Sequence, residues 1–157
     1  MNKETQYIIK SFESTLSGQP WFGRGVYEML AEIDESIVKM KPNNNSHSLL
    51  ELLWHMCTWA EFCLANLEGR SNDELSAIEK NDWRELNPVL HSWKNGINEL
   101  KSTHDRIIKS LNEKDDSFLS DMVPTRQYNF RFMLNGLVQH NIYHLGQIAY
   151  VKKMLMA

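Results

Sequence analysis

The residues best suited to chemistry in this sequence are two histidines four positions apart, His140 and His144. On a helix this spacing places both imidazoles on one face, one turn apart, where one metal ion can reach both. Apolar residues recur along nearly the same face, which directs the pair toward a protein interior: Met133, Leu137, Ile148 and Val151. Imidazole nitrogens in a core must be satisfied, and a shared metal ion is the simplest way to do so.

A metal site needs a further ligand, and His55 is the best candidate. It lies in a strongly apolar segment, on the same side as Leu52, Trp59 and Phe62, where an unused imidazole would be costly. His104 is the alternative, because it also occupies an apolar position of its own segment, although it could be an ordinary buried histidine bonded to backbone or a carboxylate. Three histidines with an open fourth position are typical of catalytic zinc and also suit nickel, iron or cobalt.

No general acid or base is evident beside these histidines. Glu51 and Glu61 are the nearest acidic residues to His55 in the sequence, and the helical pattern places both on the polar side. A hydrolase would be expected to hold a carboxylate near its metal, whereas a thiol-dependent reaction depends mainly on the metal for activation, so the sequence favours thiol chemistry. Three polar residues are candidates for orienting the imidazoles, or are simply polar helix positions: Asn141, Tyr143 and Gln147.

The elements that must position these residues are helices. Apolar residues recur every three to four positions over most of the chain, a period that strands do not produce. Five segments carry this pattern: 4–17, 20–40, 48–67, 88–112 and 130–156. The connections 70–87 and 113–129 are long for a bundle, so at least one is expected to cross a bundle end or to contribute to a site. We predict one all-α domain over residues 1–157, a four-helix bundle with a short extra N-terminal helix.

Composition excludes several classes of protein. The chain has 157 residues, a net charge of −3 and no stretch rich in Lys and Arg, so we expect no nucleic-acid partner. It has no apolar run of roughly 18 residues or more and no layout of a secretion signal, so we expect a cytoplasmic protein without a membrane partner. Cys57 and Cys63 lie too far apart along one predicted helix to form a disulfide with each other, which fits a reducing compartment.

Three stretches of the sequence resemble the DinB-like (YfiT-like) family of metal-dependent enzymes. They are Trp21-Phe22-Gly23 with residues 26–30 (Val-Tyr-Glu-Met-Leu), residues 47–59 (His-Ser-Leu-Leu-Glu-Leu-Leu-Trp-His-Met-Cys-Thr-Trp) and residues 140–148 (His-Asn-Ile-Tyr-His-Leu-Gly-Gln-Ile). The third stretch is the most specific, because it joins the histidine pair to a tyrosine, a glycine and a glutamine. The similarity covers nearly the whole chain.

The resemblance implies an up-down-down-up four-helix bundle of DinB/YfiT type, usually a homodimer, with a divalent metal ion. The family's three ligand positions correspond to His55, His140 and His144, which argues against His104. The resemblance does not distinguish zinc, nickel, iron and cobalt.

The activities known in the family are varied. They include S-transferases that use bacillithiol, mycothiol or glutathione, an isomerase that uses such a thiol, and members inferred to be hydrolases. We therefore expect a thiol-dependent S-transferase that acts on a small electrophilic substrate, with a low-molecular-weight thiol as co-substrate. The alternatives are a metal-dependent hydrolase of small amides or esters, a non-enzymatic metal-binding dimer, and a helical interaction protein without a metal.

Overall fold

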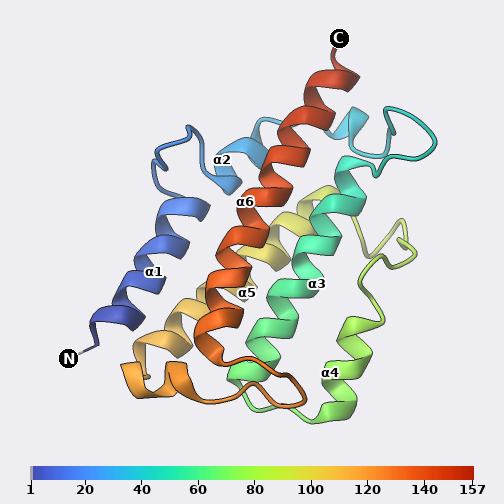
Figure 1. The fold of residues 1–157 in the computed structure, drawn as a ribbon. Helices are drawn as coiled ribbons and strands as arrows, with labels where there is room; N and C mark the ends of the chain where they lie inside the picture. The colour runs from blue at the N-terminus through green and yellow to red at the C-terminus, as the bar shows by residue number, and fades with distance from the viewer. Residues whose placement is uncertain (1) are drawn as a thin grey trace.

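Four long helices carry the structure, which is a computed structural model describing residues 2–157. They are α1 (Lys3–Leu16), α3 (Leu49–Leu67), α5 (Trp93–Asn112) and α6 (Phe130–Leu155). Figure 1 shows α1 and α6 running in one direction and α3 and α5 in the other, so that the order along the chain is up, down, down, up. The prediction of an all-α helical bundle is therefore confirmed.

The central helix is α3, which packs against α5, α6 and the short helix α4 (Asn72–Glu79). Nearly all of its residues are buried, which explains why apolar residues occur on every side of this helix. Its first turn is held by a capping box, in which Ser48 Oγ accepts a hydrogen bond from Glu51 N (3.2 Å) and the Glu51 carboxylate accepts one from Ser48 N (2.7 Å). This box sets where the helix begins.

The prediction of one long helix over residues 20–40 is wrong. That segment contains only α2 (Val26–Ala31) and a short 3-10 helix, η1 (Glu35–Ile37). Gly23 adopts a φ of +130°, which side-chain-bearing residues rarely take, and so breaks a helix before α2 can begin. After α2, the Asp34 side chain accepts a hydrogen bond from Ser36 N at 2.8 Å and starts the 3-10 turn instead of continuing the helix.

The N-terminal helix α1 is consequently one of the four helices of the bundle. The short extra helix, which was predicted at the N-terminus, is α2 instead. The 14-residue α1 buries one apolar face in the core: Ile8, Ile9, Phe12 and Leu16. Its N-terminus is capped from far along the chain, because the Asp116 carboxylate accepts a hydrogen bond from Thr5 N at 2.8 Å. Asp116 belongs to η2 (Asp116–Ser120), a 3-10 helix in the polar connection before α6.

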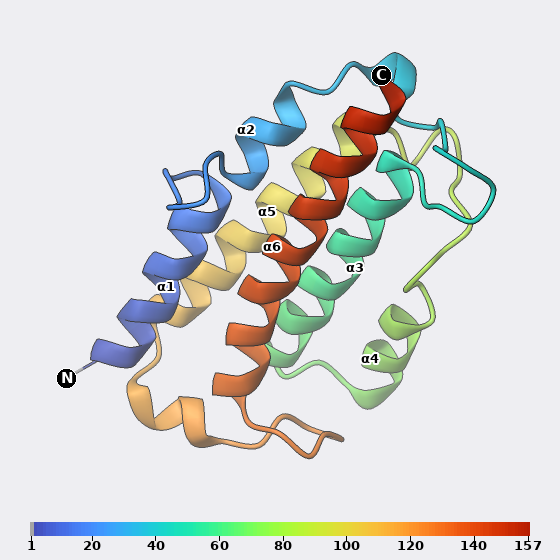
Figure 2. The ribbon, with the colours of Figure 1, turned by 45° about the horizontal axis from the view of Figure 1, so that its top comes forward.

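The connection between α3 and α5 crosses the length of the bundle, which Figure 2 shows along the outer side of α3. Within it, α4 was not predicted, because only Leu75 of this helix is buried and one apolar contact leaves no periodic pattern. The predicted start of the next helix at residue 88 is also wrong. Ser92 caps α5 through a 3.1 Å bond from Asn95 N, so the helix begins at Trp93.

No helix among residues 2–157 has both the length and the apolar character that crossing a bilayer requires. Cys57 and Cys63 are free, buried thiols on α3, in agreement with the prediction that they do not pair.

Helices α3 and α5 are in close contact at Gly96. A Cβ placed on this glycine would lie 2.7 Å from Leu53 Cδ2 and 3.2 Å from Trp54 Nε1. The carbonyl of Gly96 also accepts a hydrogen bond from Cys57 Sγ at 3.3 Å. The helix that carries His55 is therefore packed against α5 at a position where any side chain larger than that of glycine would require Leu53 to move.

We expect Gly96→Val to lower the free energy of unfolding by about 1–3 kcal/mol, because the added side chain overpacks the contact between α3 and α5. The measurement is urea denaturation followed by circular dichroism. Gly146→Val is the matched control, since a Cβ there meets nothing within 4 Å. Equal stability of the two variants would show that the close contact at Gly96 is not needed.

Candidate metal centre

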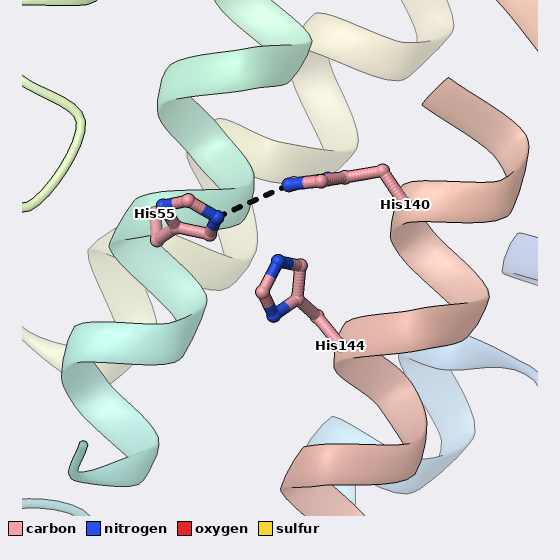
Figure 3. A group of neighbouring side chains, drawn as sticks. All are labelled: His55, His140 and His144. Carbon is pink, nitrogen blue, oxygen red and sulfur yellow. Dashed lines mark hydrogen bonds between the residues drawn. The ribbon is translucent and has the colours of Figure 1, made fainter. Parts of the chain in front are cut away.

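Three imidazoles from two helices meet between α3 and α6. His55 projects from α3, and His140 and His144 project toward it from successive turns of α6 (Figure 3). One ring nitrogen from each lies within 4.8 Å of the others, and the two Nε2 atoms of His55 and His140 are 3.1 Å apart. The structure thus brings together the three histidines that the sequence singled out, in an arrangement that could hold a metal ion.

Burial keeps these imidazoles neutral. It lowers the pKa of His140 to about 3, with further lowering by the neighbouring His144 and His55 rings. It lowers the pKa of His144 to about 4, again with a contribution from His55, and it lowers the pKa of His55 as well. Because a metal binds the neutral imidazole, the cluster is ready to act as a ligand set at neutral pH.

The outer nitrogens of two rings are held by hydrogen bonds. His55 Nδ1 donates to Asp82 Oδ1 at 2.8 Å, and His144 Nδ1 donates to Gln147 Oε1 at 2.6 Å. A proton fixed on Nδ1 leaves the lone pair on Nε2, so these partners direct the Nε2 atoms of both rings into the cluster. His140 Nδ1 is buried and has no hydrogen-bond partner among residues 2–157, and its Nε2 faces His55. Three imidazole donors of this kind fit zinc, nickel, iron or cobalt.

Asp82 is the residue that sequence reasoning missed: the spacing of residues made no acid or base evident, and the structure places this carboxylate beside His55. It lies in the connection after α4, 27 positions from His55. Its Oδ1 also accepts a hydrogen bond from Trp59 Nε1 at 2.7 Å, one turn along α3 from His55. Asp82 Oδ1 therefore holds the rings of both His55 and Trp59 in place.

Trp83 covers the outer side of the cluster and was also missed. Its ring stacks on His55 at 3.9 Å between centroids and on His47 at 3.7 Å, with interplanar angles of 8° and 7°. Trp83 is 44% exposed, so it separates the His55 ring from solvent on that face. Neither Asp82 nor Trp83 lies in a periodic segment, and no pattern in the sequence could have placed them here.

His104, the alternative ligand, lies outside the cluster. It is fully buried on α5, where its Nδ1 donates to the carbonyl of Leu100 at 2.8 Å and its Nε2 accepts from Asn141 Nδ2 at 3.0 Å. It is thus an ordinary satisfied core histidine, and Asn141 orients it instead of a cluster histidine. Tyr143 is 64% exposed and meets only the edge of the His144 ring, so Gln147 alone of the three polar candidates bonds to the cluster.

Glu51 and Glu61 pair with cationic side chains rather than with the cluster histidines, and the Glu51 carboxylate also lies 3.8 Å from Nδ1 of His47. Glu51 caps α3 and pairs with Lys41 at 2.8 Å, and Glu61 pairs with Arg70.

A model of the DinB superfamily matches residues 24–148, and the chain belongs to this superfamily. The matched range includes all three cluster histidines as well as Asp82 and Gln147. A search of curated proteins finds no significant match.

We expect Asp82→Asn to weaken binding of Zn²⁺ or Co²⁺ by about 10–100-fold, because a second partner that fixes a ligand ring typically contributes this much to metal affinity. Competition with a chromophoric chelator measures the affinity. Asp73→Asn, an exposed aspartate on α4, is the control and should bind as the parent protein does. If the two variants bind metal equally well, Asp82 does not orient a ligand.

We also expect the metal-free protein to lose stability as the pH falls from about 6.5 to 4. Burial lowers the pKa of His104 to about 4, so in this range the unfolded chain binds a proton that the folded protein does not. The stabilisation is complete above the unfolded pKa and declines as pH falls, by up to about 1.4 kcal/mol per pH unit for each such histidine. Urea denaturation in chelator should show a shallower pH dependence for His104→Gln. Parallel curves for variant and parent would contradict this assignment.

Proposed function

We propose that the protein is a metal-dependent enzyme that transfers a low-molecular-weight thiol to small electrophiles in the cytoplasm. The observation that carries the proposal is the convergence of three neutral imidazoles, from His55, His140 and His144, in a protein of the DinB superfamily. The resemblance to DinB-like enzymes supplies the class of reaction, and it also leads us to propose a homodimer.

A divalent ion held by these three imidazoles would lower the pKa of a coordinated thiol toward neutrality. Residues of the chain orient the imidazoles and exclude water. Asp82 and Gln147 hold the protons on Nδ1 of His55 and His144, so that both rings keep a fixed orientation. Trp83 excludes water from one face of His55. In the transfer, the sulfur forms a bond to an electrophilic carbon, the leaving group departs with its electron pair, and the thiol proton passes to solvent.

Hydrolysis of a small amide or ester is the second candidate, and the carboxylate beside His55 is the observation that favours it. A hydrolase needs a carboxylate free to accept a proton from water. Asp82 Oδ1 already accepts hydrogen bonds from His55 Nδ1 and Trp59 Nε1. Both hydrogen bonds fall on Oδ1, so the carboxylate serves to hold the His55 and Trp59 rings, and only its Oδ2 would be left to accept a proton from water.

The experiment is turnover by protein purified without a metal-chelating column and reconstituted with Zn²⁺, Ni²⁺, Fe²⁺ or Co²⁺. Bacillithiol, mycothiol and glutathione are each paired with 1-chloro-2,4-dinitrobenzene. We expect metal-dependent conjugation with at least one thiol, falling to the level of metal-free protein in His55→Ala, because two imidazoles leave the ligand set incomplete. Hydrolysis of 4-nitrophenyl acetate without conjugation would favour the hydrolase, and full activity without metal would refute both.

A further inference from the structure

An apolar cavity of about 180 Å³ lies beside the histidine cluster, between α3 and α6. From α3 it is lined by Trp59, Phe62 and Cys63, and from α6 by Gly136, Leu137 and His140 among others. The connection before α6 closes one side with Tyr128. The absence of a side chain at Gly136 leaves part of this space open, since a Cβ there would meet nothing within 4 Å.

The cavity and the cluster share residues. The His140 ring forms part of the cavity wall while its Nε2 faces His55. Trp59 lines the same wall, with its ring centroid 6.5 Å from that of His140, and donates to the Asp82 carboxylate that holds His55. A molecule in the cavity therefore lies against a ring of the candidate metal centre.

The walls select an uncharged, apolar group. No residue that lines the cavity carries a charged side chain, and its one thiol, Cys63, is kept protonated because burial raises the pKa to about 12. The guanidinium of Arg126 lies 5.1 Å from the centroid of the Phe62 ring and is paired with Glu79. The indole N–H of Trp59 is already bonded to Asp82. The wall thus offers little to a polar ligand.

The volume of the cavity, about 180 Å³, is enough for one aromatic ring. An apolar cavity of roughly 150 Å³ in a protein core accommodates benzene. The space beside His140 therefore has room for a single aromatic ring or a short branched alkyl group.

We propose that this cavity binds the apolar group of the electrophilic substrate, a single aromatic ring or a short branched alkyl chain, with its reacting carbon directed toward the histidine cluster. The proposal rests on the proposed function and names its substrate class as small apolar electrophiles. The polar thiol co-substrate would approach from outside the cavity.

The first test is binding of toluene to the metal-free, ¹⁵N-labelled protein in the presence of a chelator. Binding is measured by the changes in amide chemical shifts as toluene is added. We expect saturable shifts at residues around Gly136 and His140. Gly136→Leu should weaken binding at least about tenfold, because the new side chain fills the cavity. Leucine also favours a helix more than glycine does, so this variant should fold. Gln139→Leu, which adds the same side chain at an exposed position of α6 outside the cavity, should bind toluene as the parent does.

Phe132→Ala provides a second variant, since Phe132 lines the cavity but is 66% exposed and its loss should leave the fold intact. It should weaken toluene binding several-fold. Absence of saturable binding, or equal binding by all variants, would overturn the proposal.

The second test uses the metal-loaded protein with its active thiol and compares benzyl chloride with iodoacetamide. Gly136→Leu should lower kcat/KM for benzyl chloride at least about tenfold more than it lowers kcat/KM for iodoacetamide. Equal losses for both electrophiles would show that the cavity does not select the substrate. Toluene binding without any thiol transfer would leave the cavity in place and refute the proposed function instead.

Discussion

The packing of α3 against α6 forces three imidazoles into one buried space. The other residues of the site satisfy the hydrogen-bonding groups that this packing buries. Burial makes the rings neutral, but each neutral imidazole still has one nitrogen that donates and one that accepts. Asp82 and Gln147 take the donor protons of His55 and His144. The inner Nε2 atoms of His55 and His140 lie 3.1 Å apart, where one proton can be shared between them, and a metal ion could instead accept the lone pairs of all three rings.

The residues that complete the site arrive on the crossing connection between α3 and α5. This segment is fastened to α3 one turn beyond His55, where Thr58 Oγ1 lies 3.0 Å from the carbonyl of Asn81 and accepts a hydrogen bond from Arg84 Nη2 at 2.7 Å. Asp82 and Trp83 lie between these two anchors. A connection that is too long for a simple turn is therefore used to bring a carboxylate and an aromatic ring to a helix that has neither in the right place.

Two opposite environments meet at the His140 ring. On one side lie the polar nitrogens of the cluster, and on the other an apolar cavity with no charged side chain in its wall. A nucleophile activated at the cluster and an apolar electrophile in the cavity would be held next to each other, which is how a small bundle can orient two reactants without a mobile lid. Trp59 joins the two environments, because it lines the cavity and also bonds to Asp82.

The sequence by itself determined the helical class and the cluster histidines, because both are local patterns: apolar residues repeat at the helical period, and the spacing of His140 and His144 sets one face of one helix. The sequence pattern wrongly predicted one long helix over residues 20–40. There the backbone of Gly23 and the turn at Asp34 interrupt the helix despite the periodic apolar residues. The sequence already favoured His55 over His104 as the partner of the pair, and the structure places His55 there. Only the tertiary structure decided that Asp82, Trp83 and the cavity lie beside these histidines. These depend on contacts between residues distant in the chain, which hydrophobic periodicity does not encode.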